Sequence, residues 1–155
     1  MWIICEGLDK AGKTTLEWDL LKKTNYKHIV IDRGPASYLV FDRIFERETQ
    51  KGIKEFTRQS ELIANNDDFI VVYCHAKENK IRERLIEYKE VCDYDYKRAQ
   101  KLLDNIIYTL YRSSSTSILK LIDINTTNMS VDECTDKIIE RINIIGKVNE
   151  YQKYE

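Results

Sequence analysis

A short segment near the N-terminus decides the fold, and it reads Gly7-Leu8-Asp9-Lys10-Ala11-Gly12-Lys13-Thr14. It matches the pattern G-x-x-x-x-G-K-[ST] at every fixed position, which is the pattern of a phosphate-binding P-loop. The apolar run 2–5 precedes the segment, and residues 14–23 follow it with the pattern of a helix. Strand, loop and helix therefore come in the order that a P-loop requires.

Each fixed position of this motif has a physical task. Gly7 and Gly12 allow backbone conformations that a side chain would oppose, so the loop amides turn inward toward phosphate oxygens. The helix that starts near Lys13 adds the positive end of its dipole. The Lys13 ammonium reaches the β- and γ-phosphates, and the Thr14 hydroxyl ligates Mg²⁺. We therefore expect ATP and Mg²⁺ as ligands, with an ATP-binding set of Gly7, Leu8, Asp9, Lys10, Ala11, Gly12, Lys13, Thr14 and Thr15.

Apolar runs alternate with amphipathic segments along the whole chain. The expected strands are 2–5, 28–31, 69–74 and 118–124, and the expected helices are 14–23, 36–50, 53–65, 77–88, 95–111 and 130–145. Gly52 is expected to end the helix 36–50. This alternation predicts a three-layer α/β P-loop fold, with a parallel sheet of four to five strands flanked by helices. We expect one domain over 1–146 and a polar C-terminal tail over 147–155.

Composition narrows the class of partner. The chain has 155 residues, of which 43% are hydrophobic and 33% charged, which suits one folded domain with a solvated surface. The net charge of −1 does not favour a long nucleic acid as partner, because nucleic-acid binders are usually basic. The four cysteines are not at metal-ligand spacing. No apolar run is long enough to span a membrane and no signal peptide is apparent, so we expect a cytoplasmic protein.

The motif alone leaves the reaction open, because ATPases, GTPases and small-molecule kinases all use it. GTPases also need the guanine-reading sequence N-K-x-D, which this chain lacks. The chain is too short for the large motor and transporter ATPases. Small-molecule kinases therefore remain as the main class.

A second polar pair follows the next predicted strand. Asp32 and Arg33 come directly after the apolar run 28–31. They thus lie at the carboxyl end of a strand, where open α/β sheets bind ligands. If this strand neighbours the P-loop strand, Asp32 faces Mg²⁺, directly or through water. Arg33 then offers two parallel donors to the phosphate of an acceptor molecule.

Two segments of the chain resemble thymidylate kinases. Glu6-Gly7-Leu8-Asp9-Lys10-Ala11-Gly12-Lys13-Thr14-Thr15 closely resembles their P-loop signature, E-G-x-D-x-A-G-K-[ST]. Asp32-Arg33 followed by Ser37 is similar to the D-R-x-x-x-S stretch of the same family. The likeness extends loosely over most of the chain, and these two segments are its specific part.

The resemblance implies roles for individual side chains on the acceptor side. Asp9 would hold the sugar of the acceptor, and Arg33 would bind its phosphate. Asp32 would serve the Mg²⁺ site. Ser37 and Phe41 would line the acceptor pocket, although a place in the core of a helix explains Phe41 equally well.

The chain also departs from the family by being shorter. Family members have a further strand and much helical chain between the P-loop helix and the Asp-Arg strand, where this chain has only residues 25–27. The missing segment supplies a phosphate-binding arginine and a base-stacking phenylalanine. Arg43, Arg47 or Arg58 could replace the lost arginine, and the sequence leaves the acceptor base open.

Kinases of this type close a mobile basic lid over the γ-phosphate, which excludes water and adds positive charge. The expected lid, residues 80–96, carries Arg82, Arg84 and Lys89 but also Glu87, Glu90 and Asp93. Arg84 resembles the family's arginine at the end of the helix that enters the lid. Lys10 matches the basic P-loop residue that some members carry in place of a lid arginine. The expected catalytic residues are Lys13, Asp32, Arg84 and Lys10.

These observations predict an ATP- and Mg²⁺-dependent nucleoside monophosphate kinase, similar to thymidylate kinases, that phosphorylates dTMP or another deoxynucleoside monophosphate. One alternative is a kinase for the 5′-hydroxyl of a deoxynucleoside or polynucleotide, with Asp32 or Asp9 as base. Another is a non-catalytic nucleotide-binding module. The resemblance also suggests that the protein could form a homodimer. The apolar residues of helix 36–50 would suit a partner copy as well as the chain's own core.

Overall fold

The computed structural model describes residues 1–112 and 120–152 of the chain. Its centre is a parallel sheet of β1 (Trp2–Glu6), β2 (Ile29–Ile31), β3 (Phe69–His75) and β4 (Leu121–Asn125). The strand order is β2-β1-β3-β4, so β1 pairs with β2 on one side and with β3 on the other. The predicted parallel sheet is confirmed, with four strands in the described residues. The first residues of the strand predicted over 118–124 lie outside the described part.

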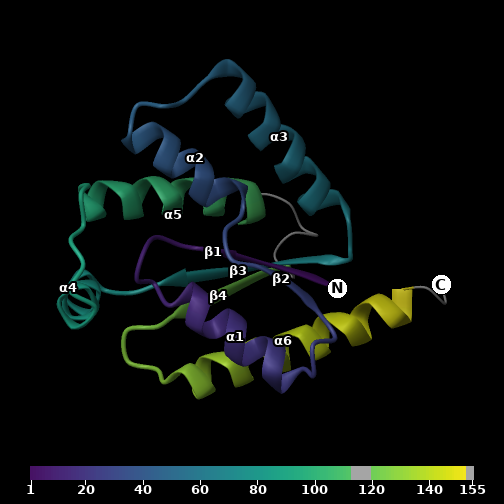
Figure 1. Cartoon of the computed structure of the whole chain (residues 1–155). Helices are drawn as coiled ribbons and strands as arrows, with labels where there is room; N and C mark the ends of the chain where they lie inside the picture. Colours follow the sequence, from purple (N-terminus) through teal and green to yellow (C-terminus); the bar gives the residue numbers. More distant parts are fainter. Residues whose placement is uncertain (113–119, 153–155) are drawn as a thin grey trace.

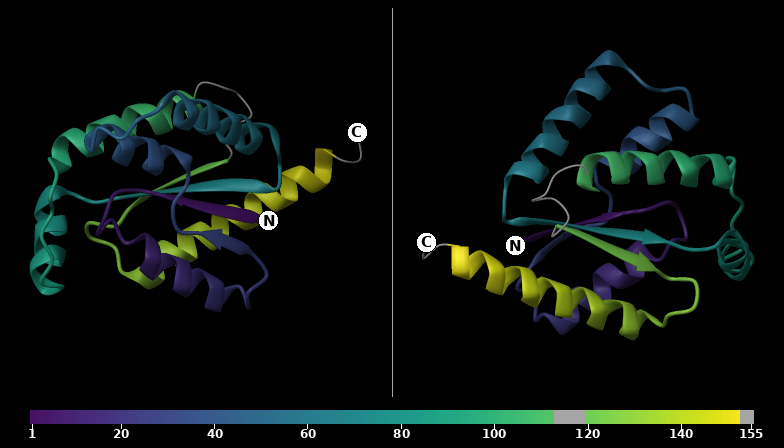
Figure 2. Two further views of the ribbon diagram at one scale, coloured as in Figure 1. Left: turned by 45° about the horizontal axis from the view of Figure 1, so that its top comes forward. Right: turned by 180° about the vertical axis from the view of Figure 1, so that it is seen from behind.

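Helices cover both faces of this sheet (Figure 1). On one face lie α1 (Lys13–Lys23) and α6 (Val131–Gln152), and on the other lie α2 (Pro35–Ile44), α3 (Gln50–Asn65) and α5 (Tyr96–Arg112). The shorter helix α4 (Glu78–Glu87) lies beyond the carboxyl end of β3. Figure 2 shows the same layers from two other directions. The predicted three-layer α/β fold is therefore confirmed.

Successive strand residues point to opposite helical layers. Ile3 of β1 packs in one cluster with Leu16 of α1 and Ile138 of α6. The next residue, Ile4, packs in the other cluster with Leu103 of α5. This is the two-residue period of a strand with both faces buried. It explains why the strands read as nearly continuous apolar runs.

The predicted boundary between the helices 36–50 and 53–65 is wrong. The helix expected over 36–50 ends at Ile44, and Gly52, expected to end it, lies in the first turn of α3. The side chain of Thr49 caps α3 by accepting a hydrogen bond from the Gly52 amide at 3.0 Å. A capping threonine therefore starts a new helix inside the stretch 36–50, which the sequence predicts as one continuous helix.

Helix α6 begins with a capping box. The Ser130 amide donates to the Glu133 carboxylate at 2.7 Å, and the Glu133 amide donates to the Ser130 hydroxyl at 3.2 Å. The helix continues to Gln152, beyond the predicted end at 145, so residues 147–152 of the expected tail are helical. Within the described residues, no helix combines the length and the apolar character needed to cross a bilayer.

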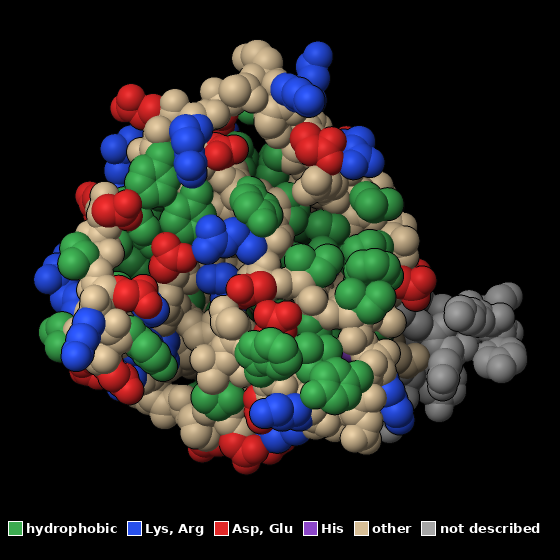
Figure 3. Space-filling view, viewed as in Figure 1, with side chains coloured by type: hydrophobic (Ala, Val, Ile, Leu, Met, Phe, Trp, Pro, Cys, Tyr) green, Lys and Arg blue, Asp and Glu red, His purple; other side chains and the backbone are tan. Residues whose placement is uncertain are grey.

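Strand β2 lies at the edge of the sheet and is poorly covered. Ile29 is 50% exposed, and Trp2 and Trp18 also expose much of their surface. Figure 3 shows hydrophobic side chains gathered on the face of the molecule that carries β2 and α1. In the described residues no strand lies beyond β2.

The turn from β2 into α2 packs tightly against β1. A Cβ on Gly34 would lie 2.4 Å from the Glu6 carboxylate and 2.4 Å from a methyl carbon of Ile4. Pro35 follows as the first residue of α2, where its missing N–H has no cost. This close approach holds the two residues before the turn, Asp32 and Arg33, beside the P-loop.

Two glycine substitutions test this packing. We expect Gly34→Ala to lower the free energy of unfolding by about 2 kcal/mol, because its new methyl group meets buried neighbours. Gly146→Ala is the matched control, since nothing lies within 4 Å of a Cβ at this position of α6. There the free energy of unfolding should rise by up to about 1 kcal/mol, because alanine favours the helix. Urea denaturation measures both values, and equal effects would contradict the close approach of the turn.

Candidate active site

The P-loop joins β1 to α1 at the carboxyl edge of the sheet. Gly7 has a φ of +151° and Gly12 a φ of +96°, in the region that favours glycine. A Cβ on Gly7 would also lie 2.4 Å from the carbonyl oxygen of Cys74 in β3. Both fixed glycines of the motif are thus required by the backbone.

Lys13 lies inside the loop. Its ammonium donates to the carbonyl oxygen of Leu8 at 2.8 Å, and only 6% of the residue is exposed. Burial lowers the pKa of Lys13, and the positive charge of Arg33 lowers it further. A buried ammonium gains from a nearby anion, so this position suits a phosphate group.

Thr14 and Asp32 meet at the ends of adjacent elements, because β2 pairs directly with β1. The Thr14 hydroxyl donates to one carboxylate oxygen of Asp32 at 3.0 Å. The other oxygen of Asp32 is buried and, among the described residues, has no hydrogen-bond partner. Such an oxygen is costly when left alone and is the kind of ligand that Mg²⁺ prefers. The pair therefore fits the Mg²⁺ site that the sequence predicts.

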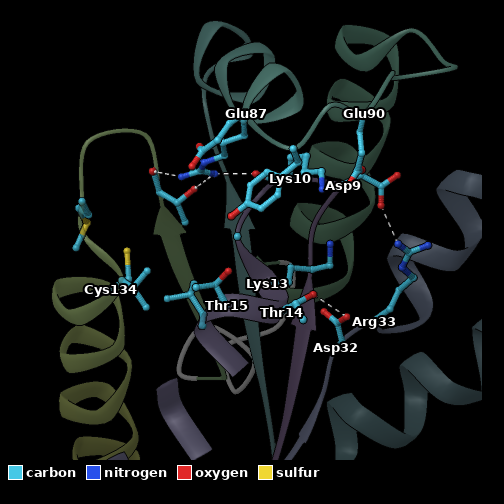
Figure 4. Close-up of a pocket in the computed structure, with 17 residues that line it drawn as sticks. Asp9, Lys10, Lys13, Thr14, Thr15, Asp32, Arg33, Glu87, Glu90 and Cys134 are labelled. Atoms are coloured by element: carbon cyan, nitrogen blue, oxygen red, sulfur yellow. Dashed lines mark hydrogen bonds and ion pairs between the residues drawn. The ribbon is translucent and has the colours of Figure 1, made fainter. Parts of the chain in front are cut away.

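These residues line a cavity of about 530 Å³ (Figure 4). Figure 4 shows Lys13 near its centre, with Asp32 and Arg33 on one side and Cys134 on the other. The wall on the Cys134 side is apolar and is formed by Leu16, Met129, Val131 and Cys134. The cavity thus combines a cationic centre with one apolar end, and its volume is that of a small-molecule site.

Arg84 and Thr126 clamp the tip of the P-loop. Arg84 donates to the carbonyl oxygen of Lys10 at 2.7 Å and to that of Thr126 at 2.8 Å. The buried Thr126 hydroxyl donates to the carbonyl oxygen of Ala11 at 2.9 Å. Sequence reasoning missed Thr126. Its place directly after β4, at the carboxyl edge of the sheet, is the signal that could have revealed it.

Arg33 is held by the P-loop itself. Its guanidinium donates to the Asp9 carboxylate at 2.9 Å and lies over the ring of Phe41, 4.5 Å from the centroid. The Tyr94 hydroxyl donates to the other Asp9 oxygen at 3.3 Å. Burial raises the pKa of Tyr94, so it remains a donor at neutral pH. Phe41 is buried, and its ring packs against the Arg33 guanidinium and edge-on against the ring of Tyr94.

Ser37 is not among the residues that line the cavity of Figure 4. The residue is fully buried, and its hydroxyl accepts a hydrogen bond from the Gly7 amide at 3.0 Å and donates to the Glu6 carboxylate. Glu6 also accepts from the amides of Ala36 at 2.9 Å and Ser37 at 2.8 Å. Burial raises the pKa of Glu6, and these hydrogen bonds oppose the rise. Ser37 therefore ties the P-loop to α2, and a place in the acceptor pocket stays a prediction.

The other basic residues that the sequence singled out divide into two groups. Lys10 points from the loop tip to the segment after α4, where it forms an ion pair with Glu90. The remaining ones bind carboxylates of their own neighbourhood: Arg43 with Glu48, Arg47 with Asp42, Arg58 with Glu55, and Arg82 with Glu78. None of these four arginines lines the cavity. They do not replace the missing phosphate-binding arginine in this conformation.

Comparison with known proteins supports the fold. No protein-family model and no curated protein sequence matches this chain. The structure of the Bacillus subtilis YorR protein in complex with phosphorylated GDP aligns with a TM-score of 0.59 and 21% identity, over 93% of this chain and 96% of that chain. Thymidylate kinase from Candida albicans aligns with a TM-score of 0.53 and 13% identity, over 92% and 91% of the two chains. At such identities the likeness establishes a nucleotide kinase-like fold.

Two serine substitutions test whether the hydrogen bonds of Ser37 stabilise the fold. We expect Ser37→Ala to lower the free energy of unfolding by about 1–3 kcal/mol, because the buried Gly7 amide loses this acceptor and Glu6 loses one of its three donors. Ser60→Ala is the control: Ser60 is also buried, but its hydroxyl has no hydrogen-bond partner among the described residues. Its loss should change the free energy by less than about 0.5 kcal/mol. Thermal and urea denaturation would measure both changes in the free energy of unfolding. Equal losses of stability in the two variants would refute the hydrogen bonds assigned to Ser37.

Proposed function

We propose that this chain is an ATP- and Mg²⁺-dependent kinase that transfers the γ-phosphate of ATP to a nucleoside monophosphate. The observation that carries the proposal is the position of Arg33. Arg33 lines the same cavity as Lys13, and Asp9 of the P-loop holds its guanidinium at 2.9 Å. Two neighbouring cationic positions, one inside the loop and one facing it, suit two phosphate groups between which a phosphoryl group passes.

The donor side is built from the P-loop and its surroundings. The loop amides, the start of α1 and Lys13 would hold the β- and γ-phosphates of ATP. Thr14 and Asp32 would hold Mg²⁺, which when bound neutralises charge on the phosphate oxygens. The apolar wall of the cavity, which includes Met129 and Val131, offers a surface for the nucleobase. Arg84 would add positive charge, since its described partners are neutral oxygens.

The state of the two candidate bases supports a phosphate acceptor over a hydroxyl acceptor. Asp9 is already engaged by Arg33 and Tyr94. Asp32 is bonded to Thr14 through one oxygen, and its other oxygen would hold Mg²⁺ on this proposal. A hydroxyl acceptor needs a carboxylate that is free to take its proton, whereas the phosphate of a monophosphate is already anionic. The resemblance of the P-loop and of the Asp-Arg segment to thymidylate kinases further supports dTMP or another deoxynucleoside monophosphate as the substrate.

On this proposal, catalysis consists of positioning and charge neutralisation. Transfer is direct and in line, without a covalent intermediate on the protein. The side chains that face the reacting groups are fixed before the ligands arrive: Lys13 by Leu8, Arg84 by Thr126, and Arg33 by Asp9 and Phe41. Such fixed charges need little rearrangement when the phosphoryl group moves.

A coupled assay of ADP release, with ATP and Mg²⁺ against nucleoside monophosphates and deoxynucleosides, tests the proposal. We expect turnover with at least one deoxynucleoside monophosphate. Lys13→Ala should lower kcat by roughly 100-fold or more, because it removes the charge inside the loop. Arg33→Gln should raise the KM for the monophosphate about tenfold and leave the KM for ATP nearly unchanged.

The matched control is Arg58→Gln, which removes an exposed arginine of α3 that does not line the cavity. It should leave both KM values unchanged. Turnover with deoxynucleosides only would replace the proposal by the hydroxyl-kinase alternative. ATP binding without turnover on any acceptor would favour a non-catalytic binding module.

A further inference from the structure

The segment between α4 and α5 crosses the tip of the P-loop and is fixed to it at two neighbouring residues. We call this segment, residues 88–95, the strap. The Glu90 carboxylate lies 2.5 Å from the Lys10 ammonium, and the Tyr94 hydroxyl donates to Asp9 at 3.3 Å. Lys10 also lies over the ring of Tyr88, 4.5 Å from its centroid. Figure 4 shows Glu90, Lys10 and Asp9 close together above the loop.

The end of α4 directs Glu90 toward the loop. The Lys89 amide donates to the carbonyl oxygen of Ile86 at 3.1 Å, and the Glu90 amide donates to that of Leu85 at 2.9 Å. This pair of bonds is a Schellman motif, which usually has glycine at its left-handed position. Here Lys89 takes that position with a φ of +54°. The chain thus accepts an unfavourable backbone conformation, and the resulting turn places Glu90 on Lys10.

Glu90 therefore forms an ion pair with Lys10, a cation that lines the phosphate cavity. Lys10, Lys13, Arg33 and Arg84 are the cationic residues of that wall in the described structure, and Lys10 is the one bound to a carboxylate of the strap. A polyphosphate that enters the cavity attracts Lys10 and repels Glu90. Both effects act against the ion pair that holds the strap.

We propose that Glu90 is a latch: its ion pair with Lys10 holds the strap closed on the nucleotide-free loop, and a bound polyphosphate displaces Glu90 and releases the strap. The inference rests on the proposed function only in taking the ligand of the cavity to be a polyphosphate. As a consequence, the Glu90 carboxylate competes with the phosphates of ATP for Lys10. The affinity for ATP is therefore lower than it would be without Glu90.

Calorimetric titrations with Mg·ATP and with inorganic tripolyphosphate test the competition. Glu90→Gln should bind both roughly three- to tenfold more tightly than the natural chain, and the gain should shrink at high salt. Glu87→Gln is the matched control, because Glu87 lines the same cavity but forms no ion pair among the described residues. It should stay within about twofold. In a Lys10→Ala background, Glu90→Gln should bring no further gain, because the latch is already broken.

The strap also contains a reporter that needs no ligand. Cys92 is partly exposed, whereas Cys5, Cys74 and Cys134 are buried. Without nucleotide, alkylation of Cys92 should be roughly threefold or more faster in Glu90→Gln and in Lys10→Ala, and unchanged in Glu87→Gln.

Unchanged alkylation in Glu90→Gln, or unchanged or weaker binding of both polyphosphates, would overturn the latch. Failure of every variant and of the natural chain to bind either polyphosphate would instead refute the proposed function. The alkylation rates would still decide whether Glu90 holds the strap.

Discussion

The geometry of the site depends on a fully buried carboxylate at the end of β1. Glu6 accepts two backbone hydrogen bonds from the start of α2 and a third from the Ser37 hydroxyl, which in turn accepts from the Gly7 amide. The carboxylate thus replaces the missing partners of a helix N-terminus and joins that helix to the first residue of the P-loop. Because Asp32 and Arg33 directly precede α2, this junction also sets their distance from Lys13. A buried charge is tolerated there only because each of its oxygens has a donor.

The second feature of the site is that its positive charges are held by the chain before any ligand binds. Lys13 and Arg84 are held largely by backbone carbonyl oxygens, whereas Arg33 and Lys10 are held by the carboxylates of Asp9 and Glu90. Partners of the first kind leave the full charge available to a phosphate. Partners of the second kind must share or release the cation, so Arg33 and Lys10 are the positions where binding and conformational change can be linked.

Local signals predicted the framework of the molecule. The P-loop could be predicted because it needs glycine at the positive-φ positions 7 and 12, and both glycines lie within one short motif. The buried parallel strands could be predicted because each is an apolar run in the sequence. The position of Asp32 beside Thr14 followed from the rule that ligands meet the carboxyl ends of neighbouring strands. Contacts between distant residues were beyond such reasoning. The Thr126 hydroxyl bonds to Ala11 across 115 positions of sequence, and the direction of Ser37 depends on the buried Glu6. The early end of α2 was hidden because the residues that precede Thr49, 45–48, contain no glycine or proline that would mark the end of a helix.

On the proposed function, one cavity would hold two phosphate-bearing ligands in line, a triphosphate at Lys13 and a monophosphate at Arg33. Calorimetric binding of an analogue that joins adenosine and deoxythymidine through five phosphates tests it most directly, because such a molecule fills both positions at once. We expect one molecule of the analogue to bind per chain, roughly 100-fold or more tightly than ATP. An affinity no better than that of ATP would contradict the presence of an acceptor phosphate site at Arg33.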